Sequence, residues 1–434
     1  MSLSSLFSRA ARERFVATVR NEGWRAAATR TQNYVGRVFR GAVSRSAVPD
    51  GGGGYLNTFW RDMAQKGAFH VSHAPATLRA RPRIAMIGDL YLPQCRKYRV
   101  AQLTELWGSV DVHYDFSHYA DVPRAISLMQ TATHVMFYRT QNDARMMSYI
   151  YEARRLQLPI LYDLDDPLFS ISAYESYENM KALEPGLKAQ FLGEAPLYLG
   201  AMTLADIVTV STPGMAEHTR LYTPRPVYVR RNFADWETLD ASNTALAATG
   251  GRKDGPFRVA FASGSMGHEV DFGLIADDLA AFLDADPNRQ LVIQGHFDLK
   301  LLPQSLRDRV EMHKFRDYNR YLETLATVHC ALMPLTDDPF NRCKSAVRVI
   351  DAASVAVPSI VGRVSDMAAM VQDGVTGRIL DQGSGWRAAL EEMAADRAMT
   401  AAWGQAARTE LLANWTAQPR WPVVEPDLIA WAKG

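Results

Sequence analysis

One polar row of side chains is spaced to hold an anionic ligand. Lys344, Arg348 and Asp351 follow one another at intervals of four and three residues, which places them on one face of a helix. We expect this helix to begin near Lys344, where the free amides of Ser345 and Ala346 and the lysine ammonium can bind phosphate oxygens. A rise of ~1.5 Å per residue puts Asp351 ~10 Å further along, within reach of ribose hydroxyls. The row indicates a nucleotide-sugar site or, alternatively, an ordinary polar helix surface.

A second group of chemically active side chains is acidic. Asp163, Asp165 and Asp166 stand within four residues at the end of the apolar run 159–163. Carboxylates this close repel one another unless cations or hydroxyl donors neutralise them. One of them could orient or deprotonate an acceptor hydroxyl. Metal binding, or capping of the turn before Pro167, are the alternatives.

Two further loops carry groups suited to a polar ligand. After the apolar run 257–262, Gly264 and Ser265 allow a close approach to a phosphate or sugar. His268 in the same loop can bind donor hydroxyls or phosphate, or it can face solvent at a helix start. The cationic stretch 96–99 is a place where an anionic acceptor could dock.

Apolar runs position all of these groups at the ends of strands. They form two series, interrupted at residues 236–256, where the pattern is lost in a stretch ending in glycine and charge that we take as a linker. Alternation of such runs with helical patterns predicts two tandem Rossmann-like α/β domains, 81–235 and 257–400. Nucleotides bind at the carboxyl ends of strands in such sheets. The runs are 83–90, 110–114, 134–138, 159–163, 207–210 and 227–230, then 257–262, 291–295, 310–314, 330–335, 358–361 and 378–380.

The helix that carries the polar row also has an apolar face. Ala346, Ile350, Ala353 and Val357 recur at positions i, i+4, i+7 and i+11, a stripe that can pack on a sheet. The polar row and the core-facing stripe therefore lie on different sides of one helix.

Composition describes an ordinary globular protein of more than one domain. The chain has 434 residues, 47% hydrophobic and 22% charged, and a formal net charge of +1. The length exceeds what a single core supports, and the charge balance argues against a nucleic-acid partner. Three scattered cysteines favour neither a disulfide framework nor a zinc site. With no apolar run long enough for a membrane span and no signal peptide, we expect a cytoplasmic protein.

The first 46 residues differ from the rest. They hold nine arginines, no lysine and two acidic residues, hence a net charge of +7. Leu3, Phe7, Ala11, Phe15 and Val19 recur every four residues, which predicts a basic amphipathic helix. Such a helix can lie on an anionic membrane surface, pack on its own protein, or remain a partly ordered tail. The glycine run 51–54 is a flexible break, and we assign residues 1–80 to an N-terminal extension.

Several motifs together resemble the retaining GT-B glycosyltransferases, in particular the bacterial branch that acts in surface-polysaccharide, lipopolysaccharide and protein glycosylation. The resemblance covers roughly residues 83–385 and rests on the order and spacing of the motifs. They are SGSMGHEVDF, FNRCKSAVRVIDAASVAVPSIV and DGVTGRIL in the second domain, with KYRV, YDLDD, ADIVTVSTP and Asn232 in the first.

This resemblance implies a nucleotide-diphosphate sugar as donor, bound by the second domain, and a saccharide, glycolipid or protein acceptor bound by the first. Catalysis would take place in a cleft between them, with retention of configuration, no obligatory metal and no further cofactor. A helical tail, residues 401–434, would cross back to the first domain. Attachment at the inner face of the cytoplasmic membrane would suit such an enzyme.

The chain departs from the family's pattern at two places. Many members carry two glutamates eight residues apart near the donor helix; here the second matches Asp351 and the first matches Cys343. Members also often have an arginine and a lysine early in the second domain, absent from residues 263–272, which leaves Lys344 and Arg348 to neutralise the diphosphate. A nucleotide-sugar epimerase on the same fold, or a non-catalytic adaptor that uses its arginine-rich N-terminus, are the rival hypotheses.

Overall fold

The computed structural model describes residues 80–434 except 251–254, 265–268, 303, 382–383 and 418–422, together with Val16, Val19, Trp24 and Ala28, which are helical. The chain divides into two compact units, residues 1–69 and 70–434, and the description below concerns the second. The predicted basic helix otherwise lies outside the described residues, as do the predicted site residues Ser265 and His268. Within the described part, no helix is long and apolar enough to span a membrane.

Six parallel strands form the first sheet, in the order β2-β1-β3-β4-β5-β6. Strand β2 lies on one side of β1 and β3 on the other, so the order in which strands are added reverses between β1 and β3. In chain order the elements are β1 (Arg83–Gly88), α4 (Pro93–Arg96), η3 (Lys97–Ala101), α5 (Gln102–Gly108), β2 (His113–His118), α6 (Val122–Thr131), β3 (His134–Tyr138), α7 (Ala144–Arg155), β4 (Ile160–Leu164), α8 (Ile171–Ser176), η4 (Glu178–Ala182), α9 (Pro185–Thr203), β5 (Ile207–Val210), α10 (Pro213–Arg220) and β6 (Val227–Val229).

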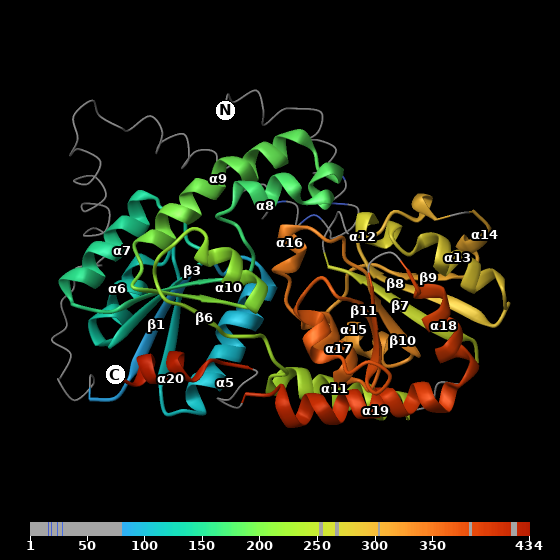
Figure 1. Ribbon diagram of the computed structural model, residues 1–434. Coiled ribbons are helices and arrows are strands. Elements are labelled where there is room, and N and C mark those ends of the chain that lie inside the picture. Colours follow the sequence, from blue (N-terminus) through green and yellow to red (C-terminus); the bar gives the residue numbers. More distant parts are fainter. Residues whose placement is uncertain are drawn as a thin grey trace. The chain divides into compact units, whose positions relative to one another are not determined.

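A second six-stranded parallel sheet follows, in the order β12-β11-β10-β7-β8-β9, with its reversal between β7 and β10. Figure 1 shows the two sheets, each with helices on both faces. The elements are α11 (Trp236–Thr249), β7 (Phe257–Ser263), α12 (Glu269–Gly273), α13 (Ala276–Asp284), β8 (Arg289–Gly295), η5 (Leu299–Leu301), α14 (Gln304–Arg307), β9 (Val310–His313), α15 (Tyr318–Leu325), β10 (Cys330–Met333), α16 (Pro339–Arg342), α17 (Val347–Ser354), β11 (Ser359–Gly362), η6 (Asp366–Met370), β12 (Gly377–Leu380), α18 (Trp386–Ala395), α19 (Arg397–Asn414) and α20 (Pro426–Lys433).

Two cores cover the faces of the second sheet. On one face, apolar side chains of α11, α15, α17 and α19 pack together, and α11 and α19 run side by side (Figure 1). On the other face, α13 and α18 pack with the aromatic residues of β7. Burial of both faces explains why these strands are nearly continuous apolar runs rather than alternating ones.

The C-terminal tail returns to the first sheet. Val424 forms an antiparallel bridge with Arg230, which follows β6, and the amide of Arg231 donates to the carbonyl of Val423 at 2.7 Å. Leu428 and Ala432 of α20 are buried in the same core as α5 and the first strands. The last segment of the chain therefore completes the first domain.

Several helices begin where local chemistry satisfies their first amides. The side chains of Asp121, Asp143, Thr212 and Asp235 each accept a hydrogen bond from the amide three residues later. These caps start α6, α7, α10 and α11. The last of them shows that the predicted linker 236–256 is largely helical, because α11 occupies residues 236–249.

Most predicted strands are confirmed within one or two residues, and the α/β fold class with two Rossmann-like domains is confirmed. Two expectations were wrong. The run 110–114 is not the strand itself, since β2 occupies His113–His118. Helix α17 begins at Val347 instead of near Lys344, so the row of Lys344, Arg348 and Asp351 does not lie on one continuous helix.

Candidate functional site

Gly264 and the segment 334–346 follow the two strands, β7 and β10, that flank the reversal point of the second sheet. Gly264 follows β7, and residues 334–346 connect β10 through α16 to α17. In doubly wound sheets, ligands bind at this kind of position, outside the carboxyl ends of the strands. Gly264 is exposed, and a Cβ atom added to it would meet nothing within 4 Å among the described residues beyond its chain neighbours. Of the residues predicted to bind a nucleotide, Gly264 and Lys344 belong to these two segments.

The start of α17 presents amides to this point. Ala346 is the residue before the first turn and provides no side-chain cap, so the first-turn amides stay available to a ligand. Ser345 would be the usual capping residue, but its Oγ accepts a hydrogen bond from Nδ2 of Asn232 at 3.2 Å. The Ser345 hydroxyl is therefore engaged by a residue of the first domain.

Lys344 and Asp166 were predicted separately and lie against each other. The Lys344 Nζ is 3.3 Å from Oδ1 of Asp166, with 25% and 29% of the two side chains exposed. The ammonium also lies 4.7 Å from the centre of the Phe340 ring. Burial opposes charging of Lys344, but the Asp166 carboxylate and the Tyr177 hydroxyl together outweigh it, and the pKa of the lysine is raised. This ion pair joins the two domains at the carboxyl ends of β4 and β10.

Arg348 and Asp351 both lie on α17, after Lys344 in the chain. Nη1 of Arg348 donates to the carbonyl of Ala262 near the end of β7 at 3.4 Å; burial lowers its pKa, although Asp271 counteracts this. Asp351 accepts a hydrogen bond from the Tyr318 hydroxyl at 2.7 Å. Burial raises the pKa of Asp351 to about 6, despite the opposing effects of Tyr318 and Lys97.

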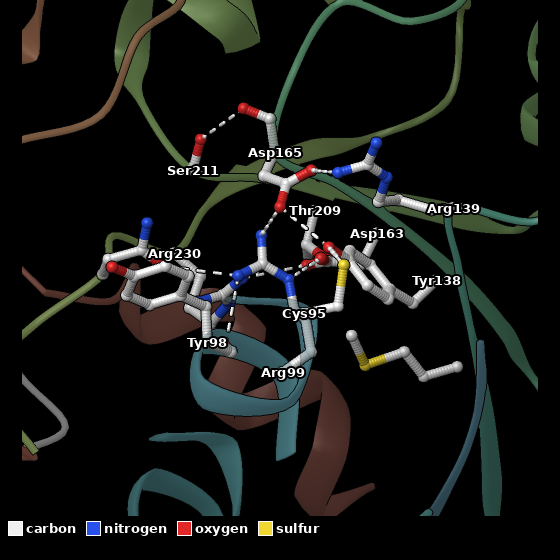
Figure 2. A network of polar contacts seen from close by, with 12 residues as sticks. Cys95, Tyr98, Arg99, Tyr138, Arg139, Asp163, Asp165, Thr209, Ser211 and Arg230 are labelled. Carbon is white, nitrogen blue, oxygen red and sulfur yellow. Dashed lines mark hydrogen bonds and ion pairs between the residues drawn. The ribbon is translucent and has the colours of Figure 1, made fainter. Parts of the chain in front are cut away.

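Asp163 has a different environment from the other two acids. It lies within β4 and is fully buried, where it accepts hydrogen bonds from Thr209 Oγ1 at 2.7 Å and Arg230 Nη2 at 3.2 Å, and is paired with Arg99 Nε. Figure 2 shows these donors gathered around the carboxylate. Three donors on a buried carboxylate leave no approach for an acceptor, so this geometry gives Asp163 a structural role and argues against the catalytic one expected from the sequence.

Asp165 belongs to the same network (Figure 2), and 19% of its side chain is exposed. Its carboxylate accepts from the Tyr138 hydroxyl at 2.8 Å and from Arg139 Nη1 at 3.5 Å, and Ser211 Oγ donates to its backbone carbonyl at 3.1 Å. Burial favours the neutral acid, but Arg139 and Arg99 outweigh it and lower the pKa of Asp165. The side chain therefore stays ionised near neutral pH.

Arg99 was expected to belong to a cationic docking group, and it is instead fully buried. Besides Asp163, it donates through Nη1 to Oδ1 of Asn232 at 3.3 Å. Since Asn232 in turn donates to Ser345, a continuous chain of hydrogen bonds runs from the first sheet to the start of α17. Lys97 of the same stretch is paired with Asp235 at 3.1 Å. Apart from the exposed Arg96, these cations are structural.

One further acid, Asp271 in α12, takes part in contacts between the domains. It is fully buried and accepts from the Thr336 amide at 2.9 Å, from Asn341 Nδ2 at 3.4 Å and from Asn179 Nδ2 at 2.9 Å. Asn179 belongs to the connection between β4 and β5. Asp271 therefore fixes the loop after β10 and ties it to the first domain; the asparagines gave no signal in the sequence.

The Cys343 thiol does not face the ligand position. It is buried, donates to the carbonyl of Pro339 at 3.2 Å, and burial raises its pKa to about 12, so it remains neutral. The backbone of Cys343 instead links the two domains, because its carbonyl accepts a hydrogen bond from Thr212 Oγ1 at 3.0 Å. Among the residues that the structure describes, no group of three or more His, Cys, Asp or Glu side chains is arranged to hold a metal ion.

Comparison with solved structures places the fold. The chain is similar to Anabaena Alr3699/HepE in complex with UDP and glucose, with a TM-score of 0.51, 12% identity, and coverage of 77% of this chain and 96% of that one. It is similar to sucrose-phosphate synthase from Thermosynechococcus elongatus, with a TM-score of 0.51, 15% identity and coverage of 81% and 97%. A glycosyltransferase from Rickettsia africae gives a TM-score of 0.50, 10% identity and coverage of 78% and 95%.

At this level of identity the likeness establishes the fold, two Rossmann-like domains in the GT-B arrangement. No protein-family model matches the sequence, and no curated protein is significantly similar to it.

Proposed function

We propose that this protein is a glycosyltransferase that moves a sugar from a nucleotide-diphosphate sugar to a hydroxyl of a saccharide, glycolipid or protein acceptor. The observation that carries the proposal is the contact between Lys344 of the second domain and Asp166 of the first. It brings a phosphate-binding cation beside a carboxylate suited to an acceptor hydroxyl, at the carboxyl ends of both sheets. The fold shared with HepE, whose structures hold UDP and UDP-glucose, supports the proposal and makes UDP the first nucleotide to test.

In this proposal the second domain holds the donor. The first-turn amides of α17, the hydroxyl of Ser345 and the ammonium of Lys344 bind the diphosphate, while Gly264 allows it to approach the strand end. Arg348 supplies a second positive charge, and Asp351 accepts hydrogen bonds from the ribose. Two cations balance the charge of a diphosphate diester, so we expect transfer without a divalent metal. Ser265 and His268 stay predictions, since they lie outside the described residues.

The acceptor, in turn, meets the first domain at Asp166, with Asp165 held beside it by Arg139 and Tyr138. A carboxylate at hydrogen-bonding distance can orient a hydroxyl and take its proton. The donor phosphate assisting that proton transfer, and retention of configuration at the transferred carbon, follow from the resemblance and belong to the proposal. Membrane attachment through residues 1–46 also stays a prediction.

Replacement of Lys344 by alanine tests the donor site. A charge-assisted hydrogen bond contributes about 1.5–3 kcal/mol, so Lys344→Ala should weaken UDP binding about 10- to 100-fold, as measured by isothermal titration calorimetry. Arg342→Ala is the matched control, because that exposed cation is paired with Asp337 in the same loop and should leave UDP affinity unchanged. Equal affinity in wild type and Lys344→Ala would remove the phosphate assignment.

The pH dependence of donor binding tests Asp351. Its folded pKa of about 6 means that the carboxylate needed to accept ribose hydroxyls is present above pH 6 and protonated below it. Affinity for UDP-glucose should therefore fall about tenfold between pH 7 and pH 5. UDP-glucose is the proper probe, because UDP itself has a phosphate that titrates near pH 6. Asp351→Asn should bind weakly at both pH values; an unchanged pH profile in that variant would show that another group titrates.

A nucleotide screen separates the rival functions. Thermal unfolding with UDP, GDP and ADP should show stabilisation by at least one of them, because a ligand that binds only the folded state raises the unfolding temperature. No response to any would favour the non-catalytic adaptor. A nucleotide sugar that epimerises faster than it hydrolyses, without an acceptor present, would favour the epimerase.

A further inference from the structure

A cluster of three aromatic rings lies at the carboxyl ends of β1 and β2, apart from the groups assigned above. Tyr91 follows β1, while His118 ends β2 and Tyr119 comes next. Tyr91 meets His118 edge-on, with ring centroids 4.3 Å apart, and His118 stacks on Tyr119 at 4.8 Å. Because Tyr91 is 53% exposed, this aromatic cluster presents a ring surface to solvent. Strand β1 also borders the reversal point of the first sheet, between β1 and β3, and ligands of such sheets bind at that point.

His118 carries a proton that has no acceptor among the residues that the structure describes. The Ala120 amide donates to Nδ1 at 2.9 Å, so the proton of the neutral ring is on Nε2. Burial lowers the pKa of His118, which keeps the ring neutral at pH 7. Nε2 is buried and has no hydrogen-bond partner in the described part of the chain. An unsatisfied buried donor costs about 1–3 kcal/mol, so this atom is a ready contact for a ligand oxygen.

Arg145 and Asp89 add polar groups to the same place. The Arg145 guanidinium lies 5.4 Å from the centre of the Tyr119 ring, and its Nε is a second buried donor without a partner among the described residues. Asp89, whose Oδ1 accepts from the Tyr91 amide at 3.0 Å, adds a carboxylate. Aromatic faces with a few convergent donors and acceptors are the surroundings that a sugar ring requires, since its C–H faces are apolar and its edge carries hydroxyls.

The distance from this aromatic cluster to Asp166 sets the size of the ligand. In the strand order β2-β1-β3-β4, Tyr91 follows β1 and Asp166 follows β4, two strand spacings away. Neighbouring strands lie ~4.8 Å apart, so the two side chains start about 10 Å from each other. A sugar chain that lies along the carboxyl ends of these strands can therefore present a hydroxyl of one ring to Asp166 while a following ring stacks on Tyr91.

We propose that the aromatic cluster is a remote acceptor subsite, which binds the second or third sugar ring of an oligosaccharide while the terminal ring offers its hydroxyl at Asp166. This inference rests on the proposed glycosyltransferase function and adds the class of acceptor, a chain of at least two sugars. Tyr91 supplies the stacking face, His118 Nε2–H donates to a ring or hydroxyl oxygen, and Arg145 holds the neighbouring hydroxyl. A single monosaccharide would be a poor acceptor.

The test uses the full-length protein saturated with UDP. An array of defined oligosaccharides identifies a series that the wild type binds, and calorimetric titration then compares members of that series from one to four sugars. Wild-type affinity should rise at least tenfold between the monosaccharide and the trisaccharide. Tyr91→Ala and His118→Phe should abolish this increase and leave affinity for the monosaccharide unchanged. Tyr151→Ala is the matched control, because that tyrosine is also exposed, on α7 of the same domain.

The outcomes separate this inference from the function on which it rests. If the wild type binds UDP but no oligosaccharide on the array, or if Tyr91→Ala keeps the wild-type dependence on chain length, the remote subsite is wrong and the donor assignment stands. If the wild type binds neither UDP nor another nucleoside diphosphate, the glycosyltransferase proposal itself fails. Tyr91 is exposed, so its replacement tests the site without removing a core side chain.

Discussion

Arg99→Met is expected to lower the free energy of unfolding by about 3 kcal/mol, because removing one partner of a buried ion pair leaves an uncompensated charge. Asp163 and the Arg99 side chain are both fully buried. The expected value lies at the lower end of the usual range, because Arg230 and Thr209 still donate to Asp163 after the change. Urea unfolding followed by circular dichroism measures it.

The control for this prediction is Arg96→Met, three residues earlier on an exposed position, which should change the free energy of unfolding by less than about 0.5 kcal/mol. An equally small change in the free energy of unfolding of Arg99→Met would show that Asp163 tolerates the loss of this partner. Arg99→Lys restores the charge without the fork of donors, so it should recover part of the stability.

The same variant has a second readout at the donor site. Arg99 donates to Asn232, and Asn232 donates to the Ser345 hydroxyl beside α17. Without Arg99, the side-chain amide of Asn232 loses a hydrogen-bond partner. The Asn232 side chain then no longer fixes the orientation of the Ser345 hydroxyl. UDP affinity should therefore fall several-fold in Arg99→Met even at temperatures where the protein is folded, while Arg96→Met keeps it.

The strands were predictable because both sheets are buried on both faces. A strand such as β3 or β5 is then a short apolar run, and the residue bounds of those two agree with the prediction. β2 escaped this rule because it is an edge strand with the polar sequence HYDFSH. The apolar residues just before it, Val110 and Val112, are buried in the core without belonging to the strand.

The boundaries of helix α11 are indicated in the sequence, but other features of this stretch favoured a linker. Asp235 caps its start and Gly250 ends it in a left-handed conformation, with φ of 60°, which is a common pair of helix boundaries. Its buried positions include the small residues Ala241 and Ala245, so the apolar stripe is faint. The glycine and charge that follow favoured a linker over a helix in the sequence.

The sequence indicates candidate residues for the site, but it does not indicate which of them pair with one another. Lys344 and Asp166 are 178 residues apart in the chain, and Arg99 and Asp163 are 64 apart. Nothing in the spacing of either pair indicates that they meet. Asp163 is buried and Asp166 is partly exposed because they occupy different positions at the end of β4, although only three residues separate them. Strand-end acids were therefore recognisable as a group, and only the structure separates the structural acid from the exposed one.

Asp166→Asn is expected to lower kcat by about 10²–10⁴-fold, the usual contribution of a positioned acid or base, without weakening UDP binding. The structure also predicts the direction in which UDP affinity changes, which the sequence did not. Asp166 is the ion-pair partner of Lys344, and a donor phosphate that binds the lysine must share or replace this partner. Since a partly exposed ion pair contributes about 0–1 kcal/mol, its loss should make UDP binding equal or up to about fivefold tighter.

Steady-state transfer and calorimetry together test this pair of effects. Asp337→Asn is the matched control, an exposed acid paired with Arg342 at 2.6 Å in the nearby loop, and it should change neither kcat nor UDP affinity. The double variant Lys344→Ala with Asp166→Asn completes a cycle, in which the two effects on UDP affinity should not add because the residues contact each other. Unchanged kcat with tighter UDP binding would reduce Asp166 to a counter-ion of Lys344, and Asp165 would then be the remaining carboxylate for the acceptor.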